Sequence, residues 1–280
     1  MNATRRRIVA TVEQQQGEAP SLDLVRRTLA QRAPAGIEAL SIRWSSYFRI
    51  HHRQVAKLRV RRMFVAGDAA HIHSPFGGQG MNTGLQDVWN LVWKLDLAIR
   101  GWGNERLLES YSAERRPVIK NVLETTHRLT KVMGTPHRFA QAMRDLVIPV
   151  LCRIPPFQHA FVQRLSQLAI AYGGSPIVEG DGTRYFDDSL RGGKGIGTRF
   201  LLLVPETVNA STKAAINQLS ESYSPIVEVR KVQNGRITLI RPDGYAAYEA
   251  THLNRASAVT HFRSVLERQT MQERESLLVR

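Results

Sequence analysis

Residues 67–82 combine residue types that could do chemistry. Asp68 follows an apolar run, and its carboxylate can accept hydrogen bonds from the hydroxyl groups of a ligand. Glycines lie in the same segment, and a residue without a Cβ lets the backbone approach a planar ligand closely. The first amides of a helix that begins near Gly80 have no partners inside the helix and lie at the positive end of its dipole. These features predict a site for an anion or an electron-rich ring edge. The glycines concerned are Gly77, Gly78 and Gly80.

A simpler interpretation fits the same spacing. Asp68 could serve as a cap and the glycines could form an ordinary turn between a strand and a helix. A metal site is a third interpretation, because His71, His73 and Asp68 offer three ligand atoms on one loop. No fourth ligand is evident on so short a segment, so we expect no bound metal.

Two regular elements must position this segment. The run Met63–Ala66 has no polar alternation, which favours a strand buried on both faces of a parallel sheet. The residues from about Gly80 to Ile99 form a predicted helix that ends at Gly101, a typical C-terminal glycine. Its apolar positions form a seam at spacings of three and four, namely Met81, Leu85, Val88, Val92, Leu95 and Ile99.

The rest of the chain gives a mixed α/β pattern. Ser21 caps a predicted helix that ends near Arg32, and β-branched or aromatic runs predict strands at 8–12 and 42–50. Asn104 caps a second helix, which Pro117 should kink or break. Later elements are predicted strands at 199–204, 225–232 and 236–240, helices at 211–219 and 255–269, and a turn at 241–245.

The glycine-rich stretch 172–197 is a candidate domain boundary. We therefore expect three parts. Residues 1–130 would form a partial cofactor- and substrate-binding domain, residues 131–172 a helical connector, and residues 173–280 a C-terminal domain.

Composition limits the classes of function. The 280 residues are 42% hydrophobic and 22% charged, as in soluble globular proteins. A single cysteine, Cys152, excludes an internal disulfide and fits a cytoplasmic protein. No signal peptide is recognisable, and charged residues interrupt the most apolar stretch, so we expect no membrane span. The net charge of +15 is spread along the chain rather than gathered in a tract. That distribution favours anionic small ligands over nucleic acid.

The whole string from Gly67 to Asn82 resembles the second FAD-binding motif of class A flavoprotein monooxygenases, the para-hydroxybenzoate hydroxylase-like group. Within that group it is most similar to the phenol and pentachlorophenol hydroxylase branch. The similarity continues through Asn82–Lys94 and Tyr111–Pro117.

The resemblance implies roles for individual residues. Asp68 would bind the ribityl chain of FAD, and Pro75 would lie against the flavin ring. The backbone amides of Gly80, Met81 and Asn82 would face the pyrimidine edge of the isoalloxazine. The glycines at 77 and 78 would complete this cofactor-binding loop. The stretch 44–53 resembles a strand of the substrate-binding sheet, and ordinary packing of its aromatic residues is an equal alternative. No residue is predicted to be catalytic.

The resemblance also implies a fold and an activity. The fold would be α/β, the C-terminal portion of a para-hydroxybenzoate hydroxylase-like FAD-binding fold followed by a thioredoxin-like domain. That domain has no Cys-x-x-Cys pair, so thiol redox chemistry is excluded. The activity would be hydroxylation of a phenolic or other aromatic substrate with NAD(P)H and O2. A non-catalytic flavoprotein remnant or interaction module is the alternative, and a homo-oligomer is compatible with either.

The sequence departs from the family in one important respect. The N-terminal Gly-x-Gly-x-x-Gly that holds the FAD diphosphate is absent, as is the middle Asp-Gly motif. The run Gly192–Gly197 lies in a predicted loop after the helical region and is no substitute. Met1 would then fall inside the substrate-binding domain of a family member. We expect the chain alone to bind FAD weakly or not at all.

Overall fold

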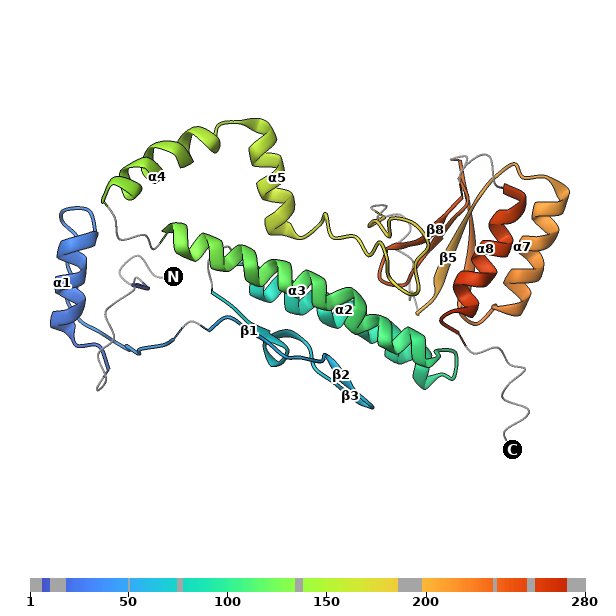
Figure 1. Ribbon diagram of the computed structural model, residues 1–280, viewed down its shortest axis with the longest axis horizontal. Coiled ribbons are helices and arrows are strands. Elements are labelled where there is room, and N and C mark those ends of the chain that lie inside the picture. The colour runs from blue at the N-terminus through green and yellow to red at the C-terminus, as the bar shows by residue number, and fades with distance from the viewer. Residues whose placement is uncertain are drawn as a thin grey trace. The chain divides into compact units, whose positions relative to one another are not determined.

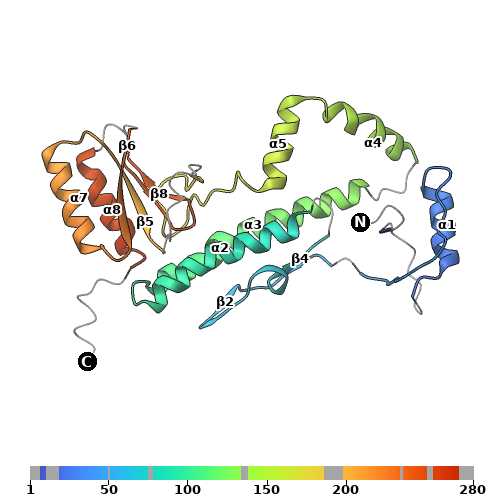
Figure 2. The same cartoon turned by 180° about the vertical axis from the view of Figure 1, so that it is seen from behind.

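The chain divides into two compact units, Met1–Ile50 and His51–Arg280. The computed structural model describes residues 7–10, 19–49, 51–74, 78–133, 138–185, 198–233, 236–250 and 255–270. Figures 1 and 2 show their elements from opposite sides. The three-part division expected from the sequence stays a prediction.

The first unit contains helix α1 (Leu22–Arg32). Ser21 caps it as predicted, because the Ser21 side chain accepts a hydrogen bond from the Leu24 amide at 3.3 Å. The strand predicted at 42–50 is wrong for the described residues 42–49, which are irregular. The strand predicted at 8–12 is likewise not formed at 8–10, and 11–12 lie outside the described residues. A strand needs a hydrogen-bonded neighbour, and no described segment of this unit supplies one.

The second unit opens with an interrupted antiparallel hairpin. Strand β1 (Arg53–Gln54) pairs with β4 (His71–Ile72), and β2 (Arg59–Val60) pairs with β3 (Met63–Phe64). The parallel, doubly buried strand predicted at Met63–Ala66 is therefore wrong in both respects. The run pairs antiparallel with the segment just before it, and Met63 is 69% exposed. Among the described residues no other strand lies beside β3.

Two long helices form the centre of this unit. Helix α2 spans Gln79–Ile99 and α3 spans Glu105–Met133. Gly101 ends α2 with φ of +78°, and the Asn104 side chain accepts a hydrogen bond from the Leu107 amide at 3.0 Å, both as predicted. Of the kink or break predicted at Pro117, the break is wrong, because α3 continues through this residue, and the kink stays a prediction. Proline removes one backbone hydrogen bond, and the buried neighbours Tyr111 and Ile119 hold both sides of it in one core.

Helix α2 is packed with its polar side inward. Thr83, Asp87, Asn90 and Lys94 are buried. The predicted apolar seam lies on the opposite side of the helix. Five of its six residues are exposed, namely Met81, Leu85, Val88, Val92 and Ile99. An amphipathic helix normally turns its apolar side to the core. The buried side of α2 therefore combines these polar groups with the apolar side chains of Leu91, Trp93 and Leu97.

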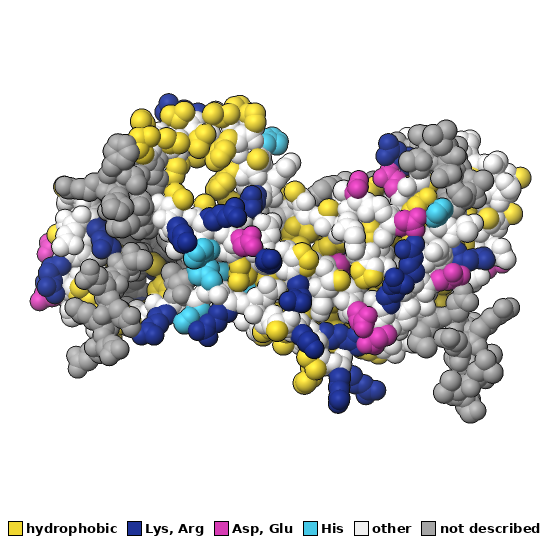
Figure 3. Space-filling model, viewed as in Figure 1, with side chains coloured by type: hydrophobic (Ala, Val, Ile, Leu, Met, Phe, Trp, Pro, Cys, Tyr) yellow, Lys and Arg dark blue, Asp and Glu magenta, His cyan; other side chains and the backbone are white. Residues whose placement is uncertain are grey.

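The connector contains helices α4 (Arg138–Leu151) and α5 (Pro155–Ser166). Figure 3 shows hydrophobic side chains gathered on the surface over these two helices. They include Leu146, Val150, Phe157 and Val162, all exposed. Among the residues that the structure describes, none of the helices has both the length and the apolar character that a membrane crossing requires.

The C-terminal part is a four-stranded sheet in the order β6-β5-β7-β8. Strands β5 (Phe200–Pro205) and β6 (Val227–Val232) are parallel, and β7 (Thr238–Ile240) and β8 (Ala246–Glu249) are antiparallel to their neighbours. Helices α7 (Ala210–Ser222) and α8 (Arg255–Glu267) lie side by side against it (Figures 1 and 2). The predicted strands, helices and turn of this part are confirmed.

A buried carboxylate joins the sheet to the helix pair. The carboxylate of Glu114, on α3, accepts hydrogen bonds from both terminal nitrogens of Arg241, at 2.6 and 2.9 Å. It also accepts one from the Lys94 ammonium at 2.8 Å. The Ser175 hydroxyl donates to it at 2.6 Å. Asp243 holds the same guanidinium from the turn after β7. All these groups are buried, so the ion pairs are shielded from water and hydrogen-bonded on several sides.

We expect Glu114→Gln to destabilise the protein strongly. The amide keeps the shape of the side chain but leaves Arg241 and Lys94 buried without their shared counter-charge. Breaking such a buried pair costs about 3–5 kcal/mol of unfolding free energy, measurable by urea denaturation. The matched control is Glu105→Gln, which removes an exposed ion pair with Arg59 and should change stability by about 1 kcal/mol or less. Equal losses in the two variants would contradict the assignment.

The same residue predicts a pH dependence. Burial opposes ionisation of Glu114, but Arg241 and Lys94 beside it hold its pKa well below the ordinary 4.5. The folded protein then binds fewer protons than the unfolded chain in acid. Its contribution to stability is complete above about pH 4.5 and is lost as the pH falls. Melting temperatures measured at a series of pH values below 4.5 should therefore fall less steeply with decreasing pH in Glu114→Gln than in the unmodified chain. An equally steep fall in both proteins would count against the prediction.

Candidate functional site

The segment 67–74 turns tightly at its first residue. Gly67 begins a 3-10 turn, η1 (Gly67–Ala69), with φ of +59°, a region that favours glycine. Gly67 also lies against Gly84 of α2, and a Cβ on Gly84 would come within 3.2 Å of the Gly67 Cα. This glycine pair lets the loop approach the first turns of the helix.

The side chain of Asp87, on α2, holds segment 67–74 in place through hydrogen bonds. Its carboxylate accepts hydrogen bonds from the Gly67 amide at 3.2 Å, from His71 Nε2 at 2.7 Å and from Arg115 Nε at 2.7 Å. Burial opposes ionisation of Asp87, but the His71 hydrogen bond and the Arg115 charge outweigh it and lower its pKa. Asp87 is therefore an anion at neutral pH, and His71 donates its Nε2 proton to it.

Arg115 carries the same network to neighbouring elements. Its guanidinium donates to the Tyr172 hydroxyl at 3.0 Å and to the Thr83 carbonyl at 3.3 Å. Gln167, just after α5, donates to the Thr83 hydroxyl at 2.6 Å. The first turns of α2 are thus held by α3, by α5 and by the loop that follows it.

The first turn of α2 contains the amides predicted to bind a ligand. Gly78 is the N-cap, with φ of +62° and no side-chain hydrogen bond to the helix, and Gly80, Met81 and Asn82 follow in the first turn. Because no side chain of the described residues caps them, these amides keep their capacity to donate outward. An alanine Cβ at Gly80 would meet only ordinary contacts, with His73 at 3.7 Å.

The remaining predicted site residues fall into two groups. Asp68 is exposed, and no described residue donates a hydrogen bond to its carboxylate. It is therefore available to a ligand. Pro75 and Gly77 lie outside the described residues. Trp44 and Phe48, from the predicted substrate strand, are exposed in the first unit, and their role stays a prediction.

The two histidines of the loop take structural positions. The rings of His71 and His73 stack with centroids 6.3 Å apart, and His73 Nδ1 lies 2.8 Å from the Ser74 carbonyl, to which it can donate. The buried Nε2 of His73 has no hydrogen-bond partner in the described part of the chain. Among the described residues, no three His, Cys, Asp or Glu side chains lie together so that they could hold a metal ion.

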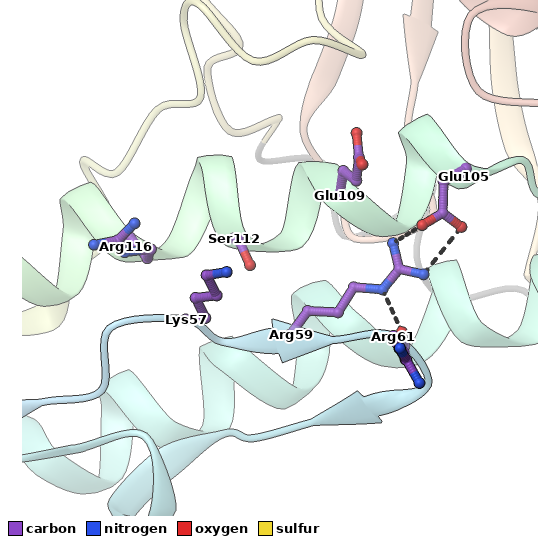
Figure 4. A pocket seen from close by; sticks show the side chains of 7 residues that line it. All are labelled: Lys57, Arg59, Arg61, Glu105, Glu109, Ser112 and Arg116. Atoms are coloured by element: carbon purple, nitrogen blue, oxygen red, sulfur yellow. Dashed lines mark hydrogen bonds and ion pairs between the residues drawn. The ribbon is translucent and has the colours of Figure 1, made fainter.

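A separate basic cleft of about 300 Å³ lies between the β2–β3 hairpin and α3 (Figure 4). Arg59 forms an ion pair with Glu105 at 2.6 Å. The other charged groups lining it are three cations and one carboxylate, so the cleft has a positive potential that suits an anion. These four residues are Lys57, Arg61, Arg116 and Glu109. None of them belongs to segment 67–82.

Sequence reasoning missed the residues that support the loop. Asp87 and Arg115 lie in the two stretches that carry the family resemblance, and Tyr172 begins the glycine-rich stretch, but none of these patterns predicts a supporting role for them. One signal was available, because Asp87, Asn90 and Lys94 are polar residues at helical spacing on the side of α2 opposite its apolar seam. Such a polar stripe inside an apolar helix indicates buried polar contacts.

We expect Asp87→Asn to loosen the loop as well as to lower stability. Arg115 would stay buried without a counter-charge, at a cost of about 3 kcal/mol or more in unfolding free energy. Amide hydrogen exchange at Gly67 and His71 should accelerate beyond the global effect. Asp96→Asn is the control, since Asp96 lies on the same helix in a half-exposed pair with Arg100. Unchanged protection of Gly67 in Asp87→Asn would refute the support role.

Comparison with known proteins identifies the family. A family model described as an FAD binding domain matches residues 3–126. A rifampicin monooxygenase of Streptomyces venezuelae is 34% identical over 236 residues, which are 82% of this chain and 48% of that protein. A pentachlorophenol 4-monooxygenase of Sphingobium chlorophenolicum is 37% identical over 131 residues, 46% of this chain and 23% of that protein.

The solved structures agree. BexE, studied for oxidation during BE-7585A biosynthesis, superimposes with a TM-score of 0.67 at 30% identity, over 91% of this chain and 54% of its own. The chain therefore spans about half the length of the rifampicin monooxygenase and of BexE. By homology, the chain belongs to the family of FAD-dependent aromatic monooxygenases.

Proposed function

We propose that this chain supplies the isoalloxazine half of the flavin site of an NAD(P)H- and O2-dependent monooxygenase that hydroxylates a phenolic or other aromatic substrate. The observation that carries the proposal is the start of α2. An uncapped helix N-terminus lies against a loop held rigidly by Asp87, and the family match includes both.

The described residues fit the flavin end of FAD. The amides of Gly80, Met81 and Asn82 would donate to the pyrimidine edge, where reduction places negative charge that the helix dipole stabilises. The exposed carboxylate of Asp68 would accept hydrogen bonds from the ribityl hydroxyls. Pro75 would lie against the ring, with Gly77 and Gly78 in the same loop. Bound flavin would supply the redox chemistry and activate dioxygen, and the protein would bind and orient it.

The 280 residues contain no motif for the adenine and diphosphate end of FAD. The Gly-x-Gly-x-x-Gly that would hold the diphosphate is absent from the sequence. This supports a second candidate, a flavoprotein remnant or interaction module without hydroxylase activity. Oxidation of NAD(P)H that is stimulated by phenols would distinguish the enzyme from the remnant. A basic nucleic-acid-binding protein would instead show retention on DNA that falls steeply with salt.

Three finer assignments belong to the same proposal. The C-terminal sheet would be a thioredoxin-like domain, which its strand order and strand directions support. The chain would belong to the phenol and pentachlorophenol hydroxylase branch, which the partial match to the pentachlorophenol enzyme supports. The nicotinamide cosubstrate is inferred from the family.

A chain that supplies only the isoalloxazine half of the flavin site should have an unusual ligand preference. We expect the chain alone to bind riboflavin and FAD with similar, weak affinity, because the half of FAD beyond the ribityl chain gains no contacts. Fluorescence titration with each flavin measures this, and little flavin should survive desalting. Stoichiometric retained FAD, or a strong preference for FAD over riboflavin, would contradict the prediction.

Gly80→Ala tests the position of the flavin edge. The Cβ meets no close protein contact, and alanine favours helix by up to about 1 kcal/mol over glycine, so folding should not suffer. Riboflavin affinity should fall several-fold because the Cβ occupies space at the helix start. Ser211→Ala is the control, since Ser211 holds the same second position in α7. Equal riboflavin affinity in both variants would exclude Gly80 from the flavin contact.

A further inference from the structure

The basic cleft between the β2–β3 hairpin and α3 has walls that are fixed to each other (Figure 4). Arg59 of β2 donates from both terminal nitrogens to the two oxygens of Glu105, at 2.6 and 3.0 Å. The Tyr111 hydroxyl of α3 donates to the Val65 carbonyl, just after β3, at 2.8 Å. Leu58 is fully buried and packs with Tyr111 in one core cluster. The cleft is therefore formed before any ligand arrives, and binding need not order its walls.

Three of the cations that line the cleft have no counter-charge in the described part of the chain. They are Lys57, Arg61 and Arg116. All three side chains belong to exposed residues. The remaining carboxylate of the lining is Glu109, and Figure 4 shows its side chain turned away from Lys57. Three cations against one carboxylate leave the cleft with a net charge of +2, which favours a doubly charged anion.

The hydroxyl of Ser112 is a further donor in the cleft. Ser110 and Thr126 of the same helix donate their hydroxyls to backbone carbonyls three and four residues earlier, at 2.6 and 2.9 Å. The Ser112 hydroxyl makes no hydrogen bond to the described residues, and Figure 4 shows it and the Lys57 ammonium pointing toward each other. Arg116 lies one helical turn beyond Ser112 on the same face of α3. An ammonium, a hydroxyl and a guanidinium therefore border one space.

Arg61 has a backbone conformation that suits another residue type. It is the first residue of the two-residue loop between β2 and β3, and its φ is +54°. Glycine is favoured at such a position, because a Cβ is strained there. Arg62 follows directly, so two like charges adjoin in the same turn. A residue that costs local stability and lines a preformed basic cleft indicates a binding role.

We propose that this cleft binds the phosphate group of a small phosphorylated molecule, with Lys57, Ser112 and Arg116 as donors and Arg61 closing the other end. A phosphomonoester carries a charge of about −2 near neutral pH and three strong acceptor oxygens, which match the net charge and the donors of the cleft. The guanidinium can donate two parallel N–H groups to phosphate, and the ammonium binds it as a point charge.

The size of the cleft favours an organic phosphate over the free ion. Its volume is about 300 Å³. At about 30 Å³ for each water-sized group, the five heavy atoms of a phosphate would fill about half of it. The other half leaves room for the body of the molecule. The site lies apart from segment 67–82, so the proposal does not depend on the proposed hydroxylase activity.

The test titrates the full chain with ribose 5-phosphate and with inorganic phosphate, without flavin and at constant ionic strength. Phosphorus NMR line widths should show saturable binding, tighter for ribose 5-phosphate than for inorganic phosphate. Arg116→Gln should weaken ribose 5-phosphate binding about tenfold, because a charge-assisted hydrogen bond is lost. The matched control is Arg128→Gln, which removes the same charge from an exposed position of α3 outside the cleft. It should bind as the unmodified chain does.

Arg61→Gly separates binding from folding. Glycine relieves the strain of the positive φ, so the melting temperature should not fall, whereas ribose 5-phosphate affinity should fall several-fold. Unchanged affinity in Arg116→Gln, or an equal loss in Arg128→Gln, would overturn the proposal. Inorganic phosphate binding as tightly as ribose 5-phosphate would overturn it in favour of the free ion. Retention of duplex DNA that Arg116→Gln weakens, without ribose 5-phosphate binding, would overturn it in favour of nucleic acid.

Discussion

The rest of the second unit depends on the hydrogen-bonded ion pairs that the buried carboxylate of Glu114 makes. This carboxylate accepts hydrogen bonds from Arg241 in the turn after β7, from Lys94 of α2 and from Ser175 in the loop after α5. Each partner alone would be an expensive buried charge or an unpaired polar atom. Held together, they offset the cost of burial, and burial still lowers the pKa of Lys94 to about 8 despite the neighbouring carboxylate. The sheet and the helix pair therefore share one polar core in addition to apolar contacts such as Trp93 against Phe200.

The next residue along α3 extends this core to the flavin segment. Glu114 faces the turn after β7, and Arg115 binds Asp87, which in turn holds Gly67 and His71. Two consecutive side chains of one helix thus position the C-terminal sheet and the proposed cofactor loop. The three cations of the combined network are balanced by three carboxylates, Asp87, Glu114 and Asp243. This balance explains how so many charges can be buried in a protein with a net charge of +15.

The sequence predicted those features that local chemistry determines. Ser21, Asn104 and Gly101 mark helix ends because a cap acts over three or four residues, and each was confirmed. The start of α2 near Gly80 followed from the same reasoning. The strands at 42–50 and 63–66 were misjudged because a strand depends on a distant neighbour that composition does not reveal. The support from Asp87 and Arg115 also required tertiary contacts, since neither residue type indicates by itself whether it is buried. Pro75 and Gly77 stay predictions.

The close approach of Gly67 and Gly84 has a consequence for how this sequence can vary. A methyl group on Gly84 would press on the Gly67 Cα, and Gly67 has a backbone conformation that other residues adopt with strain. Both positions therefore disfavour a larger residue, Gly67 because of its backbone conformation and Gly84 because of the 3.2 Å approach. The loop can stay this close to α2 only while the helix keeps a glycine at position 84.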